Sequence, residues 1–252
     1  MNHEEAVFFN VDEKKLCLNE LVNYFLSSGI GKRQSVVLTM ISSNACSILD
    51  LGCYSGHVVA EALKLFPDKK VIGGDYVEEH VKIARALHPL LDQNSFQLLN
   101  TYDLSSIKHQ FDTILFQEVI EHLEGAAHAI KEINCVLKVG GELILSTPTP
   151  YYWKDMWQSF KYELVRKYRK KDLPLSDSIY FKEHEWNRHI YCWTPSTLYT
   201  LLKVNGFEYV THAYCQDGRG FVERLVLKIF PFLSPTIIMK VKKISEALDK
   251  IV

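Results

Sequence analysis

The sequence of 252 residues has 47% hydrophobic and 23% charged residues, enough apolar side chains to bury the core of one large domain. Its formal net charge of −1 excludes a strongly basic surface and therefore argues against tight, non-specific binding of nucleic acid. Six cysteines without a Cys-x-x-Cys pair, acids in place of the basic start of a secretory signal, and no apolar run of membrane-spanning length together favour a cytoplasmic protein with reduced thiols.

The chain opens with a segment that predicts a helix over about residues 13–28, where Leu18 and Leu21 recur at helical spacing. We expect residues 1–45 to form a helical flank on a main domain over residues 46–252. Within that domain, apolar segments of strand length alternate with amphipathic helical patterns. Strands are predicted at residues 46–51, 69–75, 95–100, 111–117 and 141–147, and helices at residues 57–66, 78–87 and 126–138. This alternation predicts an α/β fold, a three-layer sandwich around a mostly parallel sheet.

The alternation stops after the fifth strand. Residues 150–192 form a long, aromatic and basic insertion, and an insertion of this size beside strand ends is typical of a lid over a substrate. After it, Thr194 predicts the cap of a helix that Gly206 ends, and a strand follows. We expect "VERLVLKIF", residues 222–230, to be the last strand, antiparallel to its neighbour. Large apolar residues alternate with lysines over residues 225–243, which favours a strand followed by a core-packed helix and leaves open a peripheral contact with a membrane.

Acidic residues and glycines follow the first three strands of the predicted sheet. Asp50 ends the first strand, and Gly52 and Gly56 frame a turn that brings backbone N–H groups close to a ligand. An acid here repels a pyrophosphate and attracts an ammonium group. Asp75 ends the second strand, where a carboxylate can accept both hydroxyls of a ribose. Asp103 follows the third strand, where its carboxylate either accepts a hydrogen bond from the exocyclic amine of an adenine or caps a turn. Together these requirements describe S-adenosylmethionine.

Four motifs carry a resemblance to a known family: "ILDLGCYSGH", "VIGGDYVEEHVKIAR", "FDTILFQEVIEHL" and "INCVLKVGGELILSTPTP". In order and character they resemble the successive motifs of the class I S-adenosylmethionine-dependent methyltransferases. The resemblance implies a Rossmann-like fold with a seven-stranded sheet, an inserted lid after the fifth strand, and S-adenosylmethionine as cofactor. It implies that the cofactor is bound by Asp50, Gly52, Tyr54, Gly56, Asp75, Tyr76, Asp103, Gln117 and Glu118. Tyr54 departs from the family pattern, which usually has a small residue there, so its ring is expected to cap the cofactor or narrow the pocket.

Catalytic candidates lie after the fourth strand and at the end of the insertion. Methyl transfer to an oxygen requires positioning and, for an acceptor of high pKa, a base or a metal. We assign catalytic roles to Glu121, His122 and His189. The same residues with Glu118 resemble the metal-binding set of the small-RNA 3′-terminal 2′-O-methyltransferases. We nevertheless assign no metal ligands, because "EVIEHL" is also common in methyltransferases without metal dependence.

The sequence therefore predicts a methyltransferase that modifies an oxygen of a small molecule, a sugar or a lipid-linked biosynthetic intermediate. Aromatic residues interleaved with cations in the insertion suit such an acceptor, small molecule or glycan. Two alternatives stay open: a metal-dependent small-RNA 2′-O-methyltransferase, and a non-catalytic binding protein with the same fold. The second alternative would require a damaged cofactor site. The sequence leaves the oligomeric state undetermined.

Overall fold

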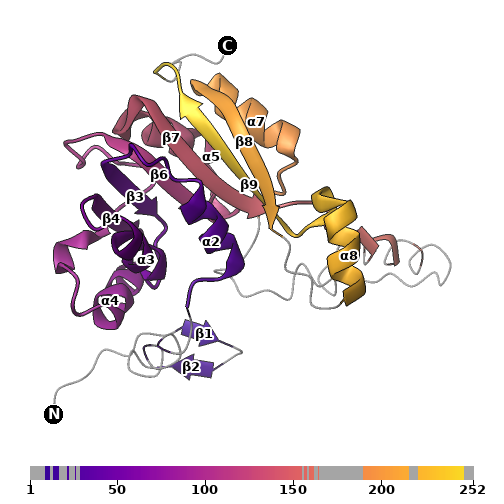
Figure 1. The fold of residues 1–252 in the computed structure, drawn as a ribbon, viewed down its shortest axis with the longest axis horizontal. Helices are drawn as coiled ribbons and strands as arrows, with labels where there is room; N and C mark the ends of the chain where they lie inside the picture. Colours follow the sequence, from indigo (N-terminus) through magenta and orange to yellow (C-terminus); the bar gives the residue numbers. More distant parts are fainter. Residues whose placement is uncertain are drawn as a thin grey trace.

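The structure is a computed structural model that describes residues 9–11, 14–16, 22, 26, 29–154, 156–157, 159–161, 164, 190–215 and 221–246. A seven-stranded sheet forms its centre (Figure 1). The strands of this sheet are β3 (Ser47–Leu51), β4 (Lys70–Asp75), β5 (Phe96–Leu98), β6 (Phe111–Gln117), β7 (Leu137–Pro148), β8 (Phe207–Cys215) and β9 (Thr236–Lys243). The helices around it are α2 (Lys32–Thr39), α3 (His57–Leu65), α4 (Glu78–Leu87), α5 (Ala126–Val136), α7 (Pro195–Val204) and α8 (Phe221–Ile229).

The strands follow the order β5-β4-β3-β6-β7-β9-β8. The pairs from β5 to β7 are parallel, whereas β9 runs antiparallel to both β7 and β8. The chain order reverses between β3 and β6, and in open α/β sheets ligands bind at the carboxyl ends of strands beside such a point. The predicted three-layer, mostly parallel, seven-stranded fold is confirmed.

Alternating side chains of the central strands fill a separate core on each face of the sheet. Leu49 and Leu51 of β3 pack in the core that contains residues of α5 and α7, while Ile48 packs in the core that contains residues of α2, α3 and α4. Figure 1 shows α5 and α7 together behind the sheet, away from α3 and α4. Because successive side chains of a strand point to opposite faces, a buried strand with helices on both sides must be apolar throughout.

The helix after the insertion begins and ends as the sequence predicts. Thr194 is the N-cap of α7, and its hydroxyl accepts a hydrogen bond from the Thr197 N–H at 3.1 Å. Gly206, just beyond the helix, adopts a φ of 86°, which an L side chain rarely takes. These two residues fix the helix between the insertion and β8.

Two segments are predicted wrongly. Residues 222–230, predicted as the last strand, lie mostly in helix α8, and the core-packed helix predicted after them is strand β9, which runs antiparallel to β7 and β8. The helix forms because Phe221, Leu225 and Ile229 repeat every four residues, whereas the β-branched run at the start of β9 favours a strand. At the other end, Lys14–Leu16 form strand β2, paired with β1 (Phe9–Val11), inside the segment predicted as a helix. Most of that segment lies outside the described residues.

Helix α2 supplies the N-terminal flank that the structure does describe. Its Val37 and Leu38 are buried in the core beside α3, and Lys240 of β9 donates a hydrogen bond to the Met40 carbonyl at 2.8 Å. These contacts hold α2 against the main sheet, so side chains at its start can reach the ends of the parallel strands. Among the described residues, no helix is both long enough and apolar enough to span a bilayer.

Candidate functional site

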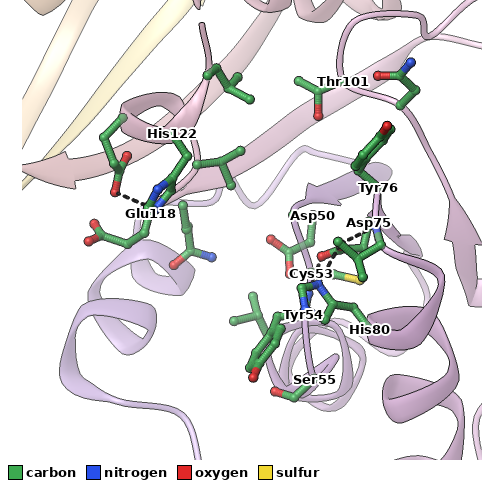
Figure 2. Close-up of a pocket in the computed structure, with 18 of the residues that line it drawn as sticks. Asp50, Cys53, Tyr54, Ser55, Asp75, Tyr76, His80, Thr101, Glu118 and His122 are labelled. Atoms are coloured by element: carbon green, nitrogen blue, oxygen red, sulfur yellow. Dashed lines mark hydrogen bonds and ion pairs between the residues drawn. The ribbon is translucent and has the colours of Figure 1, made fainter. Parts of the chain in front are cut away.

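A pocket of about 840 Å³ opens at the carboxyl ends of β3, β4 and β6. This volume is typical of a site for a cofactor or a drug-sized ligand. In Figure 2, Asp50, Tyr54, Asp75 and His80 gather on one side of the pocket, and Glu118 and His122 face them from the other. The lining brings together seven of the nine residues predicted to bind the cofactor, and the other two, Gly56 and Asp103, do not line the pocket.

The loop between β3 and α3 has the backbone geometry that the glycine motif requires. Gly52, Tyr54 and Gly56 have φ values of 87°, 46° and 73°. A Cβ on Gly52 would collide with the Val119 side chain, so the loop can approach the turn after β6 only without a side chain there. Tyr54 adopts a left-handed conformation that is costly for a residue with a bulky side chain. The backbone therefore keeps a glycine-like turn even where the sequence has tyrosine.

Asp50 is a buried acid at the floor of the pocket. Burial raises its pKa to about 7, and the charge of Asp75 adds to this, while a hydrogen bond from Gln117 and the charge of Arg33 act in the opposite direction. A cationic ligand group beside it would favour the ionised form. Asp50 can therefore accept an ammonium group.

Asp75 is held by three donors at the end of β4. The Tyr54 N–H donates to Oδ2 at 2.9 Å, the Val77 N–H donates to Oδ1 at 3.0 Å, and the His80 Nδ1 lies 2.8 Å from Oδ1. Burial raises the pKa of Asp75, but these hydrogen bonds and the His80 charge outweigh it, so the pKa lies below its ordinary value. Asp75 is therefore an ionised carboxylate facing the pocket.

Arg33 enters the pocket from helix α2 and is not among the residues that the sequence predicts for the site. Its Nη1 lies 3.4 Å from Glu118 Oε2, and its buried Nε has no hydrogen-bond partner among the described residues. A buried guanidinium N–H without an acceptor is costly, so an anionic ligand group would stabilise this arrangement. No motif marks an arginine that precedes the first strand, and only the packing of α2 reveals it.

Glu118 follows β6 in a second strained conformation. Its φ is 53°, and its Oε1 accepts a hydrogen bond from the Ser146 hydroxyl at 2.9 Å. Tyr54 and Glu118 are the non-glycine residues with positive φ in the described part of the chain, and both line this pocket. Strained backbone conformations persist only where the surrounding structure holds them, and they cluster at functional sites.

Glu121 and His122 lie in the short turn after Glu118. Glu121 is fully buried, its Oε2 accepts a hydrogen bond from the Thr147 hydroxyl at 3.1 Å, and its Oε1 lies 4.0 Å from His122 Nε2. Burial, assisted by the nearby charge of Glu118, raises the pKa of Glu121 well above its ordinary value. The structure thus brings together an acid that is protonated near neutrality and a half-exposed imidazole on the pocket wall.

The end of the insertion closes over this turn. The N–H groups of Ile190 and Tyr191 both donate to the Glu121 carbonyl, at 2.8 and 3.1 Å, and Ile190 lines the pocket. His189, predicted to be catalytic, lies outside the described residues, as does most of the insertion. Among the residues described, no group of three or more His, Cys, Asp or Glu side chains could hold a metal ion.

The structure places Asp103, the predicted adenine contact, outside the lining of the pocket. Asp103 is exposed, accepts a hydrogen bond from the Ser105 N–H at 3.1 Å, and does not line the pocket. Its carboxylate caps a turn, which is the second of the two roles that the sequence leaves open for Asp103. Its neighbours Thr101 and Tyr102 line the pocket, as does the predicted residue Tyr76. No sequence signal separates these neighbours of Asp103 from ordinary turn residues.

The residues of the pocket fit S-adenosylmethionine. An acid suits its ammonium group, and Asp75 suits its ribose. The buried Nε of Arg33, which lacks an acceptor within the described ranges, suits its carboxylate. A Cβ on Gly52 would close the space between the loop and Val119. This donor set matches the ligand that the sequence predicts.

Comparison with known proteins gives the family. Residues 15–212 match the model of a methyltransferase-domain family. A ubiquinone biosynthesis O-methyltransferase of Roseobacter denitrificans is 28% identical over 177 residues, which cover 69% of this chain and 62% of that protein. A tRNA U34 carboxymethyltransferase of Campylobacter fetus is 31% identical over 101 residues, 40% of this chain and 36% of that protein. The alignments thus span less than two thirds of these relatives.

Solved structures agree on the fold. The N-methyltransferase NodS from Bradyrhizobium japonicum WM9, in complex with S-adenosylhomocysteine, superimposes with a TM-score of 0.56 at 14% identity. The match covers 90% of this chain and 99% of that one. With the family model, the strand order and the motif loop in agreement, the chain belongs to the class I S-adenosylmethionine-dependent methyltransferases.

Proposed function

We propose that this protein transfers the methyl group of S-adenosylmethionine to an oxygen of a small molecule, a sugar or a lipid-linked biosynthetic intermediate. The observation that carries the proposal is the pairing of buried Glu121 with His122 on the wall of a pocket whose other residues suit the cofactor. When bound, the cofactor supplies an electrophilic methyl group on a sulfonium. The residues of the chain bind, orient and exclude water around it.

Three charged residues hold the two ends of the cofactor in this proposal. Asp50 accepts the ammonium group, Arg33 donates to the carboxylate, and Asp75 accepts from the ribose. Glu118 and Gln117 form the floor beneath the reacting centre, next to the turn that bears Glu121. Positioning of this kind supplies a large part of the rate enhancement in a bimolecular transfer.

His122 is the proposed general base for the acceptor hydroxyl. It is half-exposed on the pocket wall, so an acceptor can reach it, and Glu121 lies behind it at 4.0 Å. A general base is most effective when its pKa lies near the operating pH, and imidazole meets this condition. When the ring takes the hydroxyl proton, its positive charge would lower the pKa of Glu121, so that Glu121 can give up its own proton and pair with the imidazolium.

The acceptor is proposed to be apolar or lipid-linked. The matched relatives include enzymes named for ubiquinone biosynthesis. In addition, Met156, Trp157 and Phe160 lie exposed at helical spacing in the insertion, and Leu225 and Ile229 lie exposed on α8. Lys154 ties these two segments together through its ion pair with Glu223 of α8 at 2.9 Å. Exposed apolar side chains on two segments joined in this way suit a peripheral contact with a membrane that carries the acceptor.

Calorimetric titration with S-adenosylhomocysteine, in EDTA and then in Mg²⁺ or Mn²⁺, tests the cofactor first. Metal-independent binding in the micromolar range is expected. Transfer of labelled methyl groups to phenols, sugars and a prenylated phenol in anionic vesicles then tests the acceptor class. Transfer to a short RNA only in the presence of metal would overturn the proposal in favour of the RNA 2′-O-methyltransferase, and the absence of cofactor binding would favour a non-catalytic protein.

A further inference from the structure

The carboxylate proposed for the ribose is already occupied by a histidine of the protein itself. Figure 2 shows Tyr54 and His80 beside Asp75 on one side of the pocket. The Tyr54 ring meets the His80 ring edge-on, with centroids 4.4 Å apart and planes at 85°. His80 is largely buried, with a side-chain exposure of 16%. The imidazole is therefore fixed between Asp75 and an aromatic ring.

The acceptor positions of Asp75 are nearly exhausted. An ionised carboxylate offers about four acceptor positions, two on each oxygen. Oδ1 already accepts from the Val77 N–H and faces His80 Nδ1, and Oδ2 accepts from the Tyr54 N–H. Because the carboxylate only accepts, Nδ1 of His80 carries the proton. One position on Oδ2 remains, whereas a ribose diol brings two donors.

We propose that His80 competes with the cofactor ribose for Asp75, so that cofactor affinity rises with pH as His80 loses its proton, and that Tyr54 holds His80 in the competing position. This inference rests on the proposed function. An imidazolium forms a stronger, charge-assisted hydrogen bond with a carboxylate than a neutral imidazole does. The second ribose hydroxyl therefore displaces the neutral ring more easily than the charged one.

The charged groups near His80 come from three elements. Asp75 lies at the end of β4 and Asp50 at the end of β3. Glu78 and Glu79 share the first turn of α4 with His80, and Glu78 is paired with Lys82 at 3.4 Å. The Tyr54 ring lies against the imidazole from the loop after β3.

The test uses a ligand that isolates the ribose. 5′-Methylthioadenosine carries the adenine and the diol but has neither ammonium nor carboxylate, so ionisation of Asp50 does not enter through an ion pair. NMR titrations of the wild-type protein from about pH 5.5 to 7.5, the range in which histidine titrates, are expected to show affinity rising about threefold to tenfold. His80→Leu is expected to bind at low pH as tightly as the wild type does at high pH, with little dependence on pH.

Two controls keep the result specific. His109→Leu, at the opposite end of β4 beside Lys70, is expected to keep the wild-type pH profile. 2′,3′-Dideoxyadenosine, which lacks the diol, is expected to bind the wild type and His80→Leu equally. Tyr54→Gly suits the left-handed backbone and removes the ring, so it is expected to weaken the pH dependence without unfolding the loop.

Three outcomes would overturn the inference. Weaker binding of 5′-methylthioadenosine by His80→Leu at every pH would mean that His80 positions Asp75 for the ribose and does not compete with it. If His80→Leu keeps the wild-type pH dependence of 5′-methylthioadenosine affinity, His80 does not compete with the cofactor for Asp75. Failure of the wild type to bind either 5′-methylthioadenosine or S-adenosylhomocysteine would overturn the proposed function itself, and with it this inference.

Discussion

At the scale of single residues, backbone strain marks the site more clearly than side-chain identity does. Tyr54 and Glu118 come from different loops, yet both hold positive φ values and both line the same pocket. Neither conformation is intrinsically favourable for its residue type. Their convergence indicates that the loops after β3 and β6 are shaped for a ligand at some cost in stability.

Arg33 provides a prediction about the amino-acid end of the cofactor. Replacing it with methionine removes the guanidinium, whose buried Nε finds no hydrogen-bond partner in the part of the chain that the structure describes. We expect Arg33→Met to weaken S-adenosylhomocysteine binding by about tenfold to a hundredfold, the effect of a lost charge-assisted hydrogen bond. Binding of 5′-methylthioadenosine, which has no carboxylate, is expected to stay unchanged in the same calorimetric titrations.

Lys64→Met is the matched control, because Lys64 lies on α3 in an exposed pair with Glu61. It is expected to leave both affinities unchanged. Equal weakening of both ligands by Arg33→Met would mean that Arg33 only supports the pocket through Glu118.

Glu121 yields a prediction that separates stability from catalysis. Its pKa is raised by burial and by Glu118 above the ordinary value of 4.5. The folded state therefore binds this proton more tightly than the unfolded chain does. The bound proton thereby stabilises the folded state at low pH, and this contribution to the free energy of unfolding is lost as pH rises from about 4.5 through the folded-state pKa. We expect Glu121→Gln to unfold at a higher temperature than the wild type at pH 8, while methyl transfer falls about a hundredfold.

Thermal unfolding at pH 5 and pH 8 and single-turnover transfer at saturating cofactor check this prediction. At pH 5 the two proteins are expected to differ little in stability. Undiminished transfer by Glu121→Gln would contradict the proposed role of Glu121 behind His122.

At the scale of elements, the predictable parts were those in which local sequence and tertiary packing favour the same structure. The helix from Pro195 to Val204 has its own cap and a glycine stop, so its sequence alone defines it. Residues 222–230 were misassigned because a short apolar run fits either period, and only the pairing of β9 between β7 and β8 decides the outcome. Asp103 and Thr101 lie two residues apart, and only the turn geometry selects which of them faces the pocket.

Asp112 ties two neighbouring strands together at the end of the sheet opposite the pocket. Its Oδ2 accepts hydrogen bonds from the N–H groups of Cys46 and Ser47 at 3.0 and 2.9 Å, and its Oδ1 pairs with Lys138 at 2.7 Å. Burial acts to raise its pKa, but these partners lower it to about 2. The depressed pKa stabilises the fold above the unfolded value of about 4, and this stabilisation is lost as pH falls toward 2.

We therefore expect Asp112→Asn to lower the free energy of unfolding at pH 7 by about 1–2 kcal/mol, because an amide forms weaker hydrogen bonds than a carboxylate with these donors. The difference from the wild type should shrink between about pH 4 and pH 2. Urea unfolding at several pH values measures both effects. Glu61→Gln, in an exposed pair with Lys64, is expected to change stability by less than about 0.5 kcal/mol. A pH-independent difference for Asp112→Asn would rule out the ionised carboxylate as the cause.

At the scale of the whole molecule, the pocket draws its charges from segments far apart in the chain. Arg33 comes from α2, Asp50 and Asp75 from neighbouring strands, and Glu121 from the turn on which Ile190 of the insertion rests. The acids outnumber the arginine, and the pKa values of Asp50 and Glu121 are raised, so these acids retain protons that a cationic ligand would displace. The sequence motifs predicted the individual acids, but their mutual effect on protonation depends on distances that only the fold sets.

This charge balance predicts that cofactor binding releases a proton near neutral pH. Burial raises the pKa of Asp50 to about 7, and a bound ammonium group favours its ionised form. The affinity for S-adenosylhomocysteine should therefore rise relative to that for 5′-methylthioadenosine as pH increases toward and through about 7, by up to about tenfold per pH unit on the acid side. Using the ratio removes the contribution of His80, which affects both ligands through the ribose. Calorimetry in two buffers of different ionisation enthalpy counts the released protons. Asp50→Asn should bind S-adenosylhomocysteine more weakly with a constant ratio, and a constant ratio in the wild type would show that Asp50 is already ionised without the ligand.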